Sequence, residues 1–374
     1  MDPQSKKSWA EIDLKALAAN YQALVRRLQV PTEILAVVKA NAYGHGAVPV
    51  ARCLAGQGCR FFGVAQLSEA LELRRGKLRG RILVLSHLDL KEIPLLFRYR
   101  LTPVLDRIEM VRAISREARR RGGGNFPIHL KVDTGMGRLG ILPAEIPRFL
   151  QDFRRMKGLR LEGIMTHLSE ATDPVFTRFQ RQEFQKAVRL FLDAGYSPLY
   201  THSSNSAAVI LRRTGGDNLV RAGLVLYGAY PEYRLAKSGL TLKPVLTWKT
   251  RIQQIKKIPP GYRVGYGQMF LNRSARAVAV LPMGYADGYL RSLSNRAEVL
   301  VRGQRAPVIG SVCMDLTMVE VGRIPSVKAG DEVTLLGRDG RAEIRAEEMA
   351  AWAGTIPYEI FTSISGRVPR VYSG

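Results

Sequence analysis

The stretch "ILAVVKANAYGHGA" (residues 34–47) joins a strongly apolar run to a lysine and a polar loop that is broken by glycines. Residues 34–38 are all apolar, which is typical of a strand that is buried on both faces. Lys39 follows directly, and Gly44 and Gly46 interrupt regular structure soon after it. Such a lysine either lies on the surface at a strand end or provides a reactive amine. The rest of the chain decides between these two interpretations.

The N-terminal part of the chain repeats this strand-like pattern, with longer amphipathic segments between the apolar runs. The candidate strands are residues 34–39, 60–65, 81–86, 101–105, 127–133, 161–167, 198–203 and 218–223. Helical patterns lie between them at residues 68–77, 107–121 and 176–195. Strands that alternate with helices indicate a parallel sheet with right-handed crossovers, and eight such strands predict a (β/α)8 barrel of the TIM type.

The pattern changes after about residue 240, where proline and glycine separate short β-rich runs. We therefore predict a barrel domain over residues 1–240 and a mainly β domain over residues 241–374. A further strand-like run at residues 8–14 precedes the barrel pattern, so about the first ten residues could belong to the β domain instead.

Composition limits the classes of protein to consider. The chain has 374 residues, of which 46% are hydrophobic, so two domains with sizeable cores are expected. No apolar run approaches the ~20 residues that cross a bilayer, and the N-terminus lacks the apolar core of a signal peptide. The three cysteines are too few for a disulfide framework or a metal site, and Cys313 is expected to be a small buried filler. We expect a cytoplasmic protein without a membrane partner.

The net charge of +25 would suit a nucleic-acid-binding protein. However, the basic residues are spread along the chain as short pairs, and the longest run is residues 119–121. Net charge influences solubility and non-specific association rather than fold. We therefore favour a solvated basic surface over a nucleic-acid partner, although an acidic substrate or a phosphate-bearing cofactor would still be attracted.

Reactive residues collect at the carboxyl ends of the predicted strands, where the active site of a (β/α)8 barrel lies. They are Lys39, Lys131, Asp133, Arg138, His167, Asn205, Ser206 and Arg221. A lysine amine can form an imine with an aldehyde, and the loops after the last two barrel strands often bind phosphate. Asn205, Ser206 and the backbone around Gly223 and Leu224 would lie in those loops. These features predict pyridoxal 5′-phosphate, which carries both an aldehyde and a phosphate.

Several motifs resemble those of the alanine racemases, which are fold-type III pyridoxal-phosphate enzymes. In chain order they are "AVVKANAYGHGA", "KVDTGMGRLG", "THSSNSAA", "RAGLVLYGAY", "VGYGQMF", "GYADGY" and "VCMDLTMV". The resemblance extends over nearly the whole chain. It implies a (β/α)8 barrel, a C-terminal β domain and a homodimer with shared active sites. It also implies the interconversion of L-alanine and D-alanine, which supplies D-alanine for peptidoglycan.

The resemblance implies which residues hold the cofactor. Lys39 matches the lysine that binds it covalently, and Tyr43 and Tyr358 match tyrosines that contact its phosphate. Arg221 would face the pyridine nitrogen and keep it unprotonated, because a guanidinium only donates hydrogen bonds. The full implied set is Lys39, Tyr43, His167, Asn205, Ser206, Arg221, Gly223, Leu224 and Tyr358.

The resemblance also implies two catalytic bases, because racemisation at Cα needs one base on each face. Lys39 would serve one face, and Tyr266 from the partner subunit would serve the other. An unperturbed phenol has a pKa of about 10, so a tyrosine base needs positive charge nearby. His167 and Arg221 are the residues that the family places there. Without the resemblance, Tyr266 would be only a turn aromatic between two glycines.

Substrate binding is implied for four further positions. Arg138 resembles a residue that contacts the phenolic oxygen of the cofactor and the substrate carboxylate. Met314 and Asp315 resemble a segment that closes the pocket from the other subunit, and Tyr285 resembles a residue of the substrate entrance. Lys131 matches a position that is often carbamylated, and a carbamate there would orient Arg138.

Other functions stay open at the level of sequence. The nearest is a racemase of another amino acid, such as serine or a basic one. A non-catalytic pyridoxal-phosphate-binding protein would keep Lys39, but it would have no β domain to carry Tyr266. A decarboxylase of the same fold type is disfavoured by Arg221, since most pyridoxal-phosphate enzymes pair the pyridine nitrogen with a carboxylate.

Overall fold

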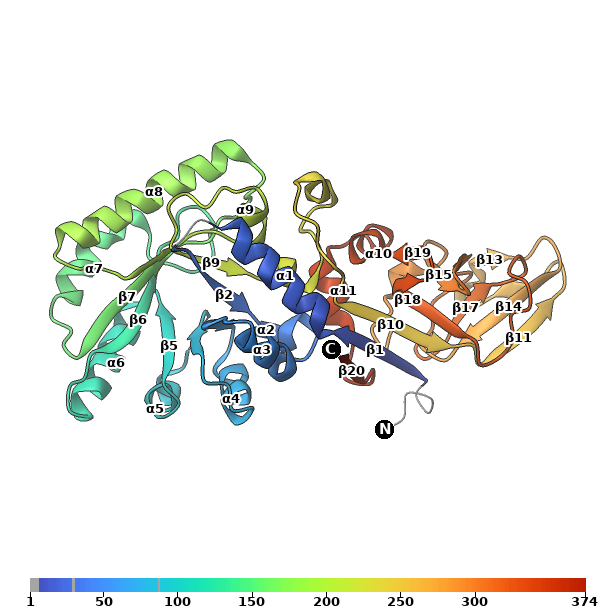
Figure 1. Ribbon diagram of the computed structural model, residues 1–374, viewed down its shortest axis with the longest axis horizontal. Coiled ribbons are helices and arrows are strands. Elements are labelled where there is room, and N and C mark those ends of the chain that lie inside the picture. Colours follow the sequence, from blue (N-terminus) through green and yellow to red (C-terminus); the bar gives the residue numbers. More distant parts are fainter. Residues whose placement is uncertain (1–6, 29–30, 87) are drawn as a thin grey trace.

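The N-terminal part of the chain is a parallel barrel that is nearly closed (Figure 1). The computed structural model describes residues 7–28, 31–86 and 88–374. Eight strands follow one another in the order β8-β7-β6-β5-β4-β3-β2-β9. They are β2 (Glu33–Val37), β3 (Phe61–Val64), β4 (Arg81–Val84), β5 (Leu101–Leu105), β6 (Phe126–Lys131), β7 (Leu159–Met165), β8 (Tyr200–His202) and β9 (Leu219–Ala222). Each overlaps one of the predicted strands, so the predicted barrel is confirmed.

Helices follow most of these strands and cover the outside of the barrel. They are α1 (Leu14–Arg27), α2 (Lys39–Tyr43), α3 (Ala47–Gly56), α4 (Leu67–Arg75), α5 (Ile93–Arg98), α6 (Ile108–Arg120), α7 (Ile146–Phe153), α8 (Pro174–Asp193) and α9 (Ser206–Ile210). Helix α6 shows why such segments form: it buries Val111, Ile114 and Ala118 on one face. The Asp173 carboxylate caps α8 by accepting hydrogen bonds from its first backbone amides. The three predicted helical segments are thereby confirmed.

The C-terminal part is mainly β, as predicted. One sheet contains β16-β15-β18-β10-β1-β20, with β19 paired to β18, and a second contains β11-β14-β17. The strands are β1 (Ser8–Asp13), β10 (Leu246–Arg251), β11 (Gln254–Ile258), β12 (Arg263–Val264), β13 (Phe270–Leu271), β14 (Arg276–Leu281), β15 (Glu298–Val301), β16 (Gln304–Pro307), β17 (Thr317–Glu320), β18 (Glu332–Asp339), β19 (Ala342–Ile344) and β20 (Arg370–Ser373). Strand β1 pairs with β10 and β20, so the first strand of the chain lies in the sheet of the C-terminal part.

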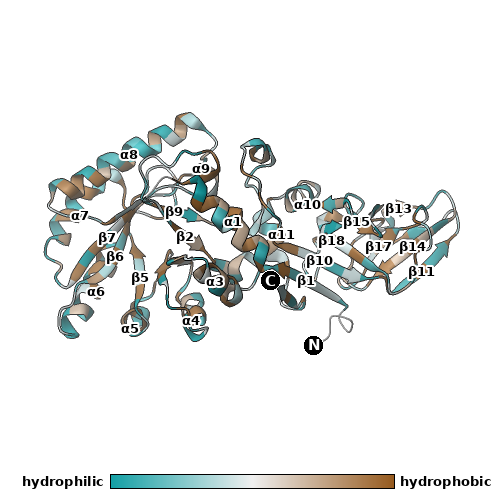
Figure 2. Ribbon diagram, in the orientation of Figure 1, coloured by the Kyte–Doolittle hydropathy of each residue, from teal (hydrophilic) through white to brown (hydrophobic). Residues whose placement is uncertain are grey.

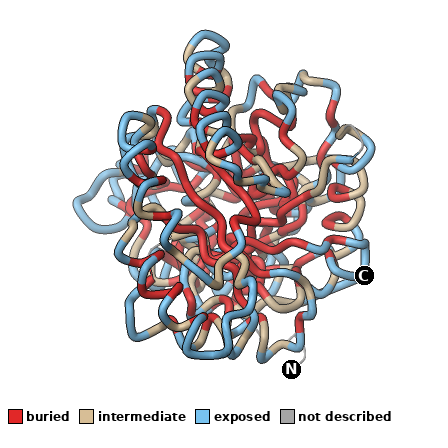
Figure 3. The backbone as a smooth tube through the Cα atoms, turned by 90° about the vertical axis from the view of Figure 1, so that its left-hand side faces the viewer, coloured by how far each residue is buried: buried red, intermediate tan, exposed pale blue. Residues whose placement is uncertain are grey.

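Burial explains why the barrel strands read as continuous apolar runs. Much of the barrel sheet is brown, and therefore hydrophobic, in Figure 2, and the interior of the molecule is mainly red, and therefore buried, in Figure 3. The outer helices alternate between hydrophobic and hydrophilic residues. Leu35, Ala36 and Val38 have no exposed surface. Burying one large apolar side chain contributes about 1.5–3 kcal/mol, so this stretch anchors the segment that follows it. No helix in the described part of the chain is both long and apolar enough to span a membrane.

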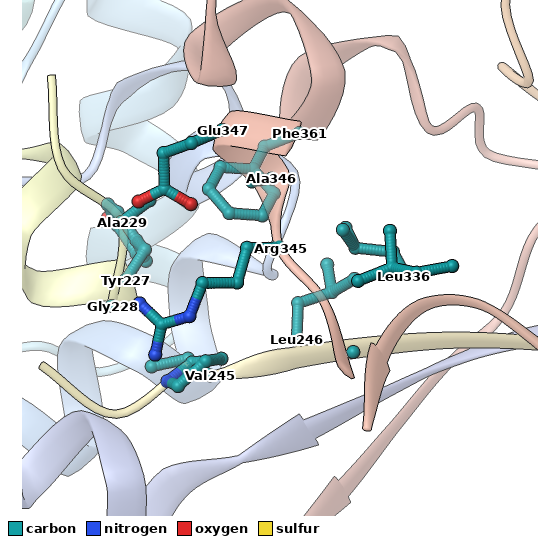
Figure 4. A pocket seen from close by; sticks show the side chains of 13 residues that line it. Tyr227, Gly228, Ala229, Val245, Leu246, Leu336, Arg345, Ala346, Glu347 and Phe361 are labelled. Carbon is teal, nitrogen blue, oxygen red and sulfur yellow. The ribbon is translucent and has the colours of Figure 1, made fainter. Parts of the chain in front are cut away.

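Two short helices, α10 (Ala346–Ala353) and α11 (Pro357–Ser363), join the C-terminal part to the barrel. Figure 4 shows Arg345 and Glu347 facing the turn that contains Tyr227 and Gly228. The Glu347 Oε1 atom accepts a hydrogen bond of 2.7 Å from the Tyr230 backbone amide. The ring of Tyr358 in α11 lies 5.9 Å from that of Tyr43, so α11 lies beside the segment that follows β2.

Gly228 is the tightest point of this junction and allows a direct test. Its φ is +81°, and a Cβ there would collide with the backbone carbonyl oxygen of Lys243. We expect Gly228→Ala to lower the free energy of unfolding by about 1–3 kcal/mol or more, measured by urea denaturation. Gly239→Ala is the matched control, because φ is +75° there but nothing lies within 4 Å. Equal losses in both variants would show that dihedral strain, and not the collision, dominates.

Candidate active site

The predicted reactive residues lie together at the carboxyl ends of the barrel strands, but several strands end earlier than expected. β2 ends at Val37, β6 at Lys131 and β7 at Met165. Lys39, Asp133 and His167 therefore lie just beyond the strands, Lys39 at the start of α2, which corrects the predicted strand ends. The reason is that the backbone turns back on itself there, as when the Ala42 amide donates to the Val38 carbonyl at 2.8 Å.

The segment after β2 is a left-handed turn. Ala40, Asn41, Ala42 and Tyr43 have φ values of 51°, 53°, 53° and 51°. Each L-residue in this conformation costs roughly 1–2 kcal/mol, so side chains must hold the turn in place. The Glu69 Oε1 atom accepts from the Ala40 amide at 2.6 Å, and the Asn41 Oδ1 atom accepts from the Ala47 amide at 2.8 Å. The turn leaves Lys39 exposed at the rim and buries Tyr43.

The electrostatic surroundings of Lys39 make its amine more nucleophilic. Partial burial and the Arg138 guanidinium lower the pKa of Lys39, while the Glu69 carboxylate acts in the opposite direction. A lower pKa increases the neutral fraction of the amine, and only a neutral amine can attack a carbonyl group.

The loop after β6 is organised by one carboxylate. The two Asp133 oxygens accept hydrogen bonds of 2.7–3.1 Å from the backbone amides of Gly135, Met136, Gly137 and Arg138. Burial raises the pKa of Asp133, but these four hydrogen bonds outweigh it and lower the pKa below its ordinary value. Asp133 thus fixes the backbone of Arg138, whose side chain is exposed.

Lys131 lies beneath this loop and is 6% exposed. Burial, together with the Arg138 and Arg221 guanidiniums, lowers the pKa of Lys131 to about 8. A substantial fraction of this buried amine is therefore neutral near physiological pH.

Arg221 is the central polar residue of the site and is 4% exposed. Its Nη1 atom donates to the His202 carbonyl at 2.7 Å and to His202 Nδ1 at 3.2 Å. Its Nη2 atom donates to the carbonyls of Thr166 and Ser203 at 2.7 and 2.8 Å and faces His167 Nδ1 at 3.3 Å. Among the described residues, no acceptor lies within hydrogen-bonding distance of its Nε–H group.

His167 is held neutral by its surroundings. Burial, followed by the positive charges of Arg221, Arg138, Lys131 and Lys39, lowers the pKa of His167 to about 3. Since the Arg221 guanidinium can only donate, the Nδ1 atom of His167 acts as acceptor and the ring carries its proton on Nε2.

Ser206 and Gly223 form a polar cradle beside the phenols of Tyr43 and Tyr358. The Ser206 Oγ atom accepts a 3.0 Å hydrogen bond from the Gly223 amide, and a Cβ at Gly223 would lie 2.6 Å from the Tyr43 hydroxyl. The rings of Tyr43 and Tyr358 lie 5.9 Å apart. Burial raises the pKa of both phenols, that of Tyr358 to about 12, so both are neutral donors at physiological pH.

Asn205 and Leu224 support this cradle from the backbone. The Asn205 Oδ1 atom caps α9 by accepting from the Ala208 amide at 3.1 Å, and its amide nitrogen donates to the Leu168 carbonyl at 3.3 Å. Leu224 begins the short helix η4 (Leu224–Tyr227) and is fully buried. Helix α9, which Asn205 caps, ends at Ile210.

Of the site residues predicted in the β domain, Tyr358 lies beside Tyr43. Among the described residues of one chain, Lys39 forms no hydrogen bond or ion pair with the other four, which are Tyr266, Tyr285, Met314 and Asp315. Tyr266 begins the short helix η6 (Tyr266–Gln268) just before β13, and β13 lies in the part of the β region away from the barrel (Figure 1). Its side chain is 74% exposed, and Met314 and Tyr285 are 54% and 42% exposed. Asp315 forms an ion pair of 2.7 Å with Arg367. Cys313, predicted to be buried, is only half-buried because this segment lies at the surface.

Sequence reasoning missed two residues of the site. Glu69 lies at the start of α4, where an acidic residue is ordinarily interpreted as a helix cap, yet it also holds the left-handed turn. His202 lies within the quoted motif "THSSNSAA", and its position one residue before the end of a predicted strand is the signal that could have identified it.

Comparison with known proteins connects this geometry to an enzyme family. Residues 12–231 match the model of the alanine racemase N-terminal domain, and residues 245–372 match that of the C-terminal domain. The alanine racemase of Symbiobacterium thermophilum is 43% identical over 99% of this chain and 98% of its own. That of Halothermothrix orenii is 42% identical over 98% and 97%.

Solved structures give the same result. Alanine racemase from D-cycloserine-producing Streptomyces lavendulae superimposes with a TM-score of 0.94 at 35% identity, covering 100% of this chain and 98% of its own. The enzyme of Bacillus anthracis with bound L-Ala-P has a TM-score of 0.91 at 34% identity, with coverage of 100% and 96%. The enzyme of Bartonella henselae, with covalently bound pyridoxal phosphate, has a TM-score of 0.89 at 30% identity, with coverage of 98% and 100%.

The coupling between Lys39 and Arg138 can be measured directly. We expect Lys39 to titrate below the unperturbed lysine value of about 10.4, and Arg138→Leu to raise its pKa by removing a positive charge. The titration can be followed by NMR of ¹³C-dimethylated lysines, with the Lys39 signal identified by its loss in Lys39→Arg. Arg138→Lys keeps the charge and is the control. An unchanged Lys39 pKa in Arg138→Leu would contradict the electrostatic argument.

Proposed function

Because the chain belongs to the alanine racemase family and is an isomerase with alanine racemase activity, we propose that Lys39 and Tyr266 are its two catalytic bases and that they come from different subunits of a homodimer. The exposure of Tyr266 carries this proposal. A phenol that is 74% exposed and lies next to β13, in the part of the β region away from the barrel (Figure 1), is free to enter the site of a second copy.

The residues at the barrel rim fit pyridoxal 5′-phosphate, on which this family depends. Lys39 offers an amine with a lowered pKa for the aldehyde, and the buried Arg221 keeps one N–H group without an acceptor among the described residues. Gly223 leaves room beside the Tyr43 hydroxyl that a larger residue would fill. When bound, the cofactor supplies an electron sink that acidifies the Cα–H bond of the amino acid.

We assign the phosphate of the cofactor to the cradle around Gly223. Tyr43 and Tyr358 are neutral phenols and can donate hydrogen bonds to an anion. The Ser206 hydroxyl, which accepts from the Gly223 amide, has its own proton left to donate. Asn205 and Leu224 hold the two backbone segments that border this space.

Arg221 is assigned to the pyridine nitrogen of the cofactor. Its Nη1 and Nη2 atoms are committed to protein acceptors, which leaves Nε–H as the donor for a ring nitrogen. Although burial lowers the pKa of Arg221 to about 10, the guanidinium stays protonated at physiological pH and cannot accept a proton from the ring. The ring nitrogen would therefore stay unprotonated, which favours simple proton exchange at Cα over other reactions.

Proton transfer then requires two positions. The Lys39 Nζ atom would remove the Cα proton of D-alanine, and the phenol oxygen of the partner's Tyr266 would remove that of L-alanine. Neutral His167 carries its proton on Nε2 and can donate a hydrogen bond to an incoming phenolate. The positive charges of Arg221 and Arg138 would favour the anionic form of such a group.

Substrate recognition is assigned to Arg138 and to the partner subunit. Asp133 holds the backbone of Arg138 in place. The exposed Arg138 guanidinium is thereby positioned to pair with the substrate carboxylate. We propose that Met314, Asp315 and Tyr285 of a second copy close the pocket. The hydrogen bonds from the Tyr285 amide to the Cys313 carbonyl and from the Ala286 amide to the Met314 carbonyl hold these residues as one surface segment.

We also propose that the barrel domain ends near residue 240 and that β1 belongs to the β domain. The family models leave residues 232–244 between their two matches. The pairing of β1 with β10 and β20 supports this division.

Mixed dimers test the shared site. Tyr266→Phe should lower racemisation by roughly 10²–10⁴-fold, the typical contribution of a positioned base, and Lys39→Ala should abolish it. A dimer of one Lys39→Ala chain and one Tyr266→Phe chain has one site with both bases intact, so it should regain a large part of the activity. Differently tagged Lys39→Ala chains, paired in the same way, are the control. A purified heterodimer without recovery would rule out a shared site.

Carbamylation of Lys131 is a separate proposal. A buried amine whose pKa is lowered to about 8 is partly neutral and can add carbon dioxide, and the resulting anion would lie between Arg138 and Arg221. With ¹³C-bicarbonate we expect a carbamate resonance at pH 7 that disappears in Lys131→Met. If the wild-type enzyme shows no such resonance at saturating bicarbonate, Lys131 is unmodified.

A further inference from the structure

A chain of buried polar side chains runs from Arg221 through the interior of the barrel towards the amino ends of its strands. His202 Nε2 lies 2.9 Å from His129 Nδ1, and His129 Nε2 lies 3.6 Å from Glu162 Oε2. Both histidines are fully buried and Glu162 is 1% exposed. The proton transfer proposed above uses none of these three residues.

The donor character of Arg221 determines where every proton in this chain lies. A guanidinium has no acceptor, so His202 Nδ1 must accept from Arg221 Nη1. His202 then carries its proton on Nε2, which donates to His129 Nδ1. His129 in turn carries its proton on Nε2, directed at Glu162. The opposite polarity would leave His202 without any ring proton.

The far end of the chain is a fixed negative charge. Glu162 Oε1 forms ion pairs with Arg81 at 2.9 Å and Arg160 at 2.6 Å. Both arginines border an open hollow at the amino ends of the barrel strands. The hydrogen bonds from Arg221 to His202 and from His202 to His129 therefore both point towards the Glu162 carboxylate, and such an arrangement polarises each bond in the same direction.

The barrel leaves room for this arrangement at one position. His129 in β6 pairs in register with Gly163 in β7, and a Cβ at Gly163 would collide with the imidazole of His129. The glycine does not have a left-handed φ, so space and not backbone conformation explains it.

We infer that His129 and Glu162 are positioning residues for Arg221: they hold His202 in the one tautomer whose Nδ1 lone pair can accept from the guanidinium. The inference rests on the proposed place of Arg221 at the pyridine nitrogen. Without the chain, His202 could turn or change tautomer, and Arg221 would lose one of its fixed acceptors.

Histidine tautomers in the holoenzyme provide the first test. The chain has five histidines, so two-bond ¹⁵N–¹H spectra of ¹⁵N-histidine-labelled enzyme can be assigned with single variants. We expect His202 and His129 both to be neutral and protonated on Nε2. A proton on Nδ1 of His202 in the wild-type enzyme would overturn the inference without any need for variants. This measurement does not depend on activity, whereas failure of the proposed function would appear in the mixed dimers.

Variants of His129 provide the second test. His129→Leu removes the acceptor, whereas His129→Asn places a carbonyl oxygen where Nδ1 was. We expect His129→Leu to mix the His202 tautomers and to lower kcat by roughly 10–100-fold with little change in KM, as expected for a displaced reactive group. His129→Asn should restore most of the single His202 tautomer and most of the wild-type kcat. Equal kcat in the wild-type enzyme and His129→Leu, or equal losses in both variants, would overturn the inference.

Gly163→Ala tests the same inference without removing a polar atom. Its methyl group should displace the His129 ring, mix the His202 tautomers and reduce kcat in the same way. Gly124→Ala, just before the same strand β6, meets nothing within 4 Å and should leave both measurements unchanged. A folded Gly163→Ala enzyme with wild-type tautomers and kcat would overturn the inference.

Discussion

The buried guanidinium of Arg221 is the interaction on which the rest of the site depends. Removing a charge from water costs several kcal/mol unless it is hydrogen-bonded, and Arg221 offsets this cost by donating to three backbone carbonyls. Those carbonyls belong to Thr166, His202 and Ser203, at the ends of β7 and β8. Arg221 itself comes from β9, so one side chain joins three neighbouring strands where the site is built.

The barrel is only nearly closed, because β8 and β9 form the two ends of the strand order. Between β8 and β9 side chains largely replace a regular backbone ladder. The Asp217 carboxylate accepts from the amides of Ser203 and Ser204, and the Asn218 Oδ1 atom accepts from the Thr201 amide. These side-chain hydrogen bonds join the two strands where the regular ladder is missing.

The arrangement of the barrel could be predicted from the sequence, but the shape of the site could not. Apolar runs such as residues 34–38 are local signals, and all eight predicted strands exist. The left-handed turn after Lys39 opposes the intrinsic preference of four non-glycine residues, so only tertiary contacts explain it. One contact comes from the other end of the chain, where Arg370 donates to the Gly44 carbonyl at 2.9 Å. The proposed role of Tyr266 is equally beyond local reasoning, because that role requires a second copy of the chain.

The charges around Lys39 explain why a basic chain need not bind nucleic acid. Lys39, Lys131, Arg138 and Arg221 are close enough for their charges to lower the pKa of His167 together. The neighbouring carboxylates of Asp133 and Glu69 are engaged by backbone amides, so they orient loops more than they neutralise the site. A site with this excess of positive charge attracts a phosphate and a substrate carboxylate. It also favours the anionic form of any acid that a partner inserts, and a phenol that must act as a base needs such surroundings.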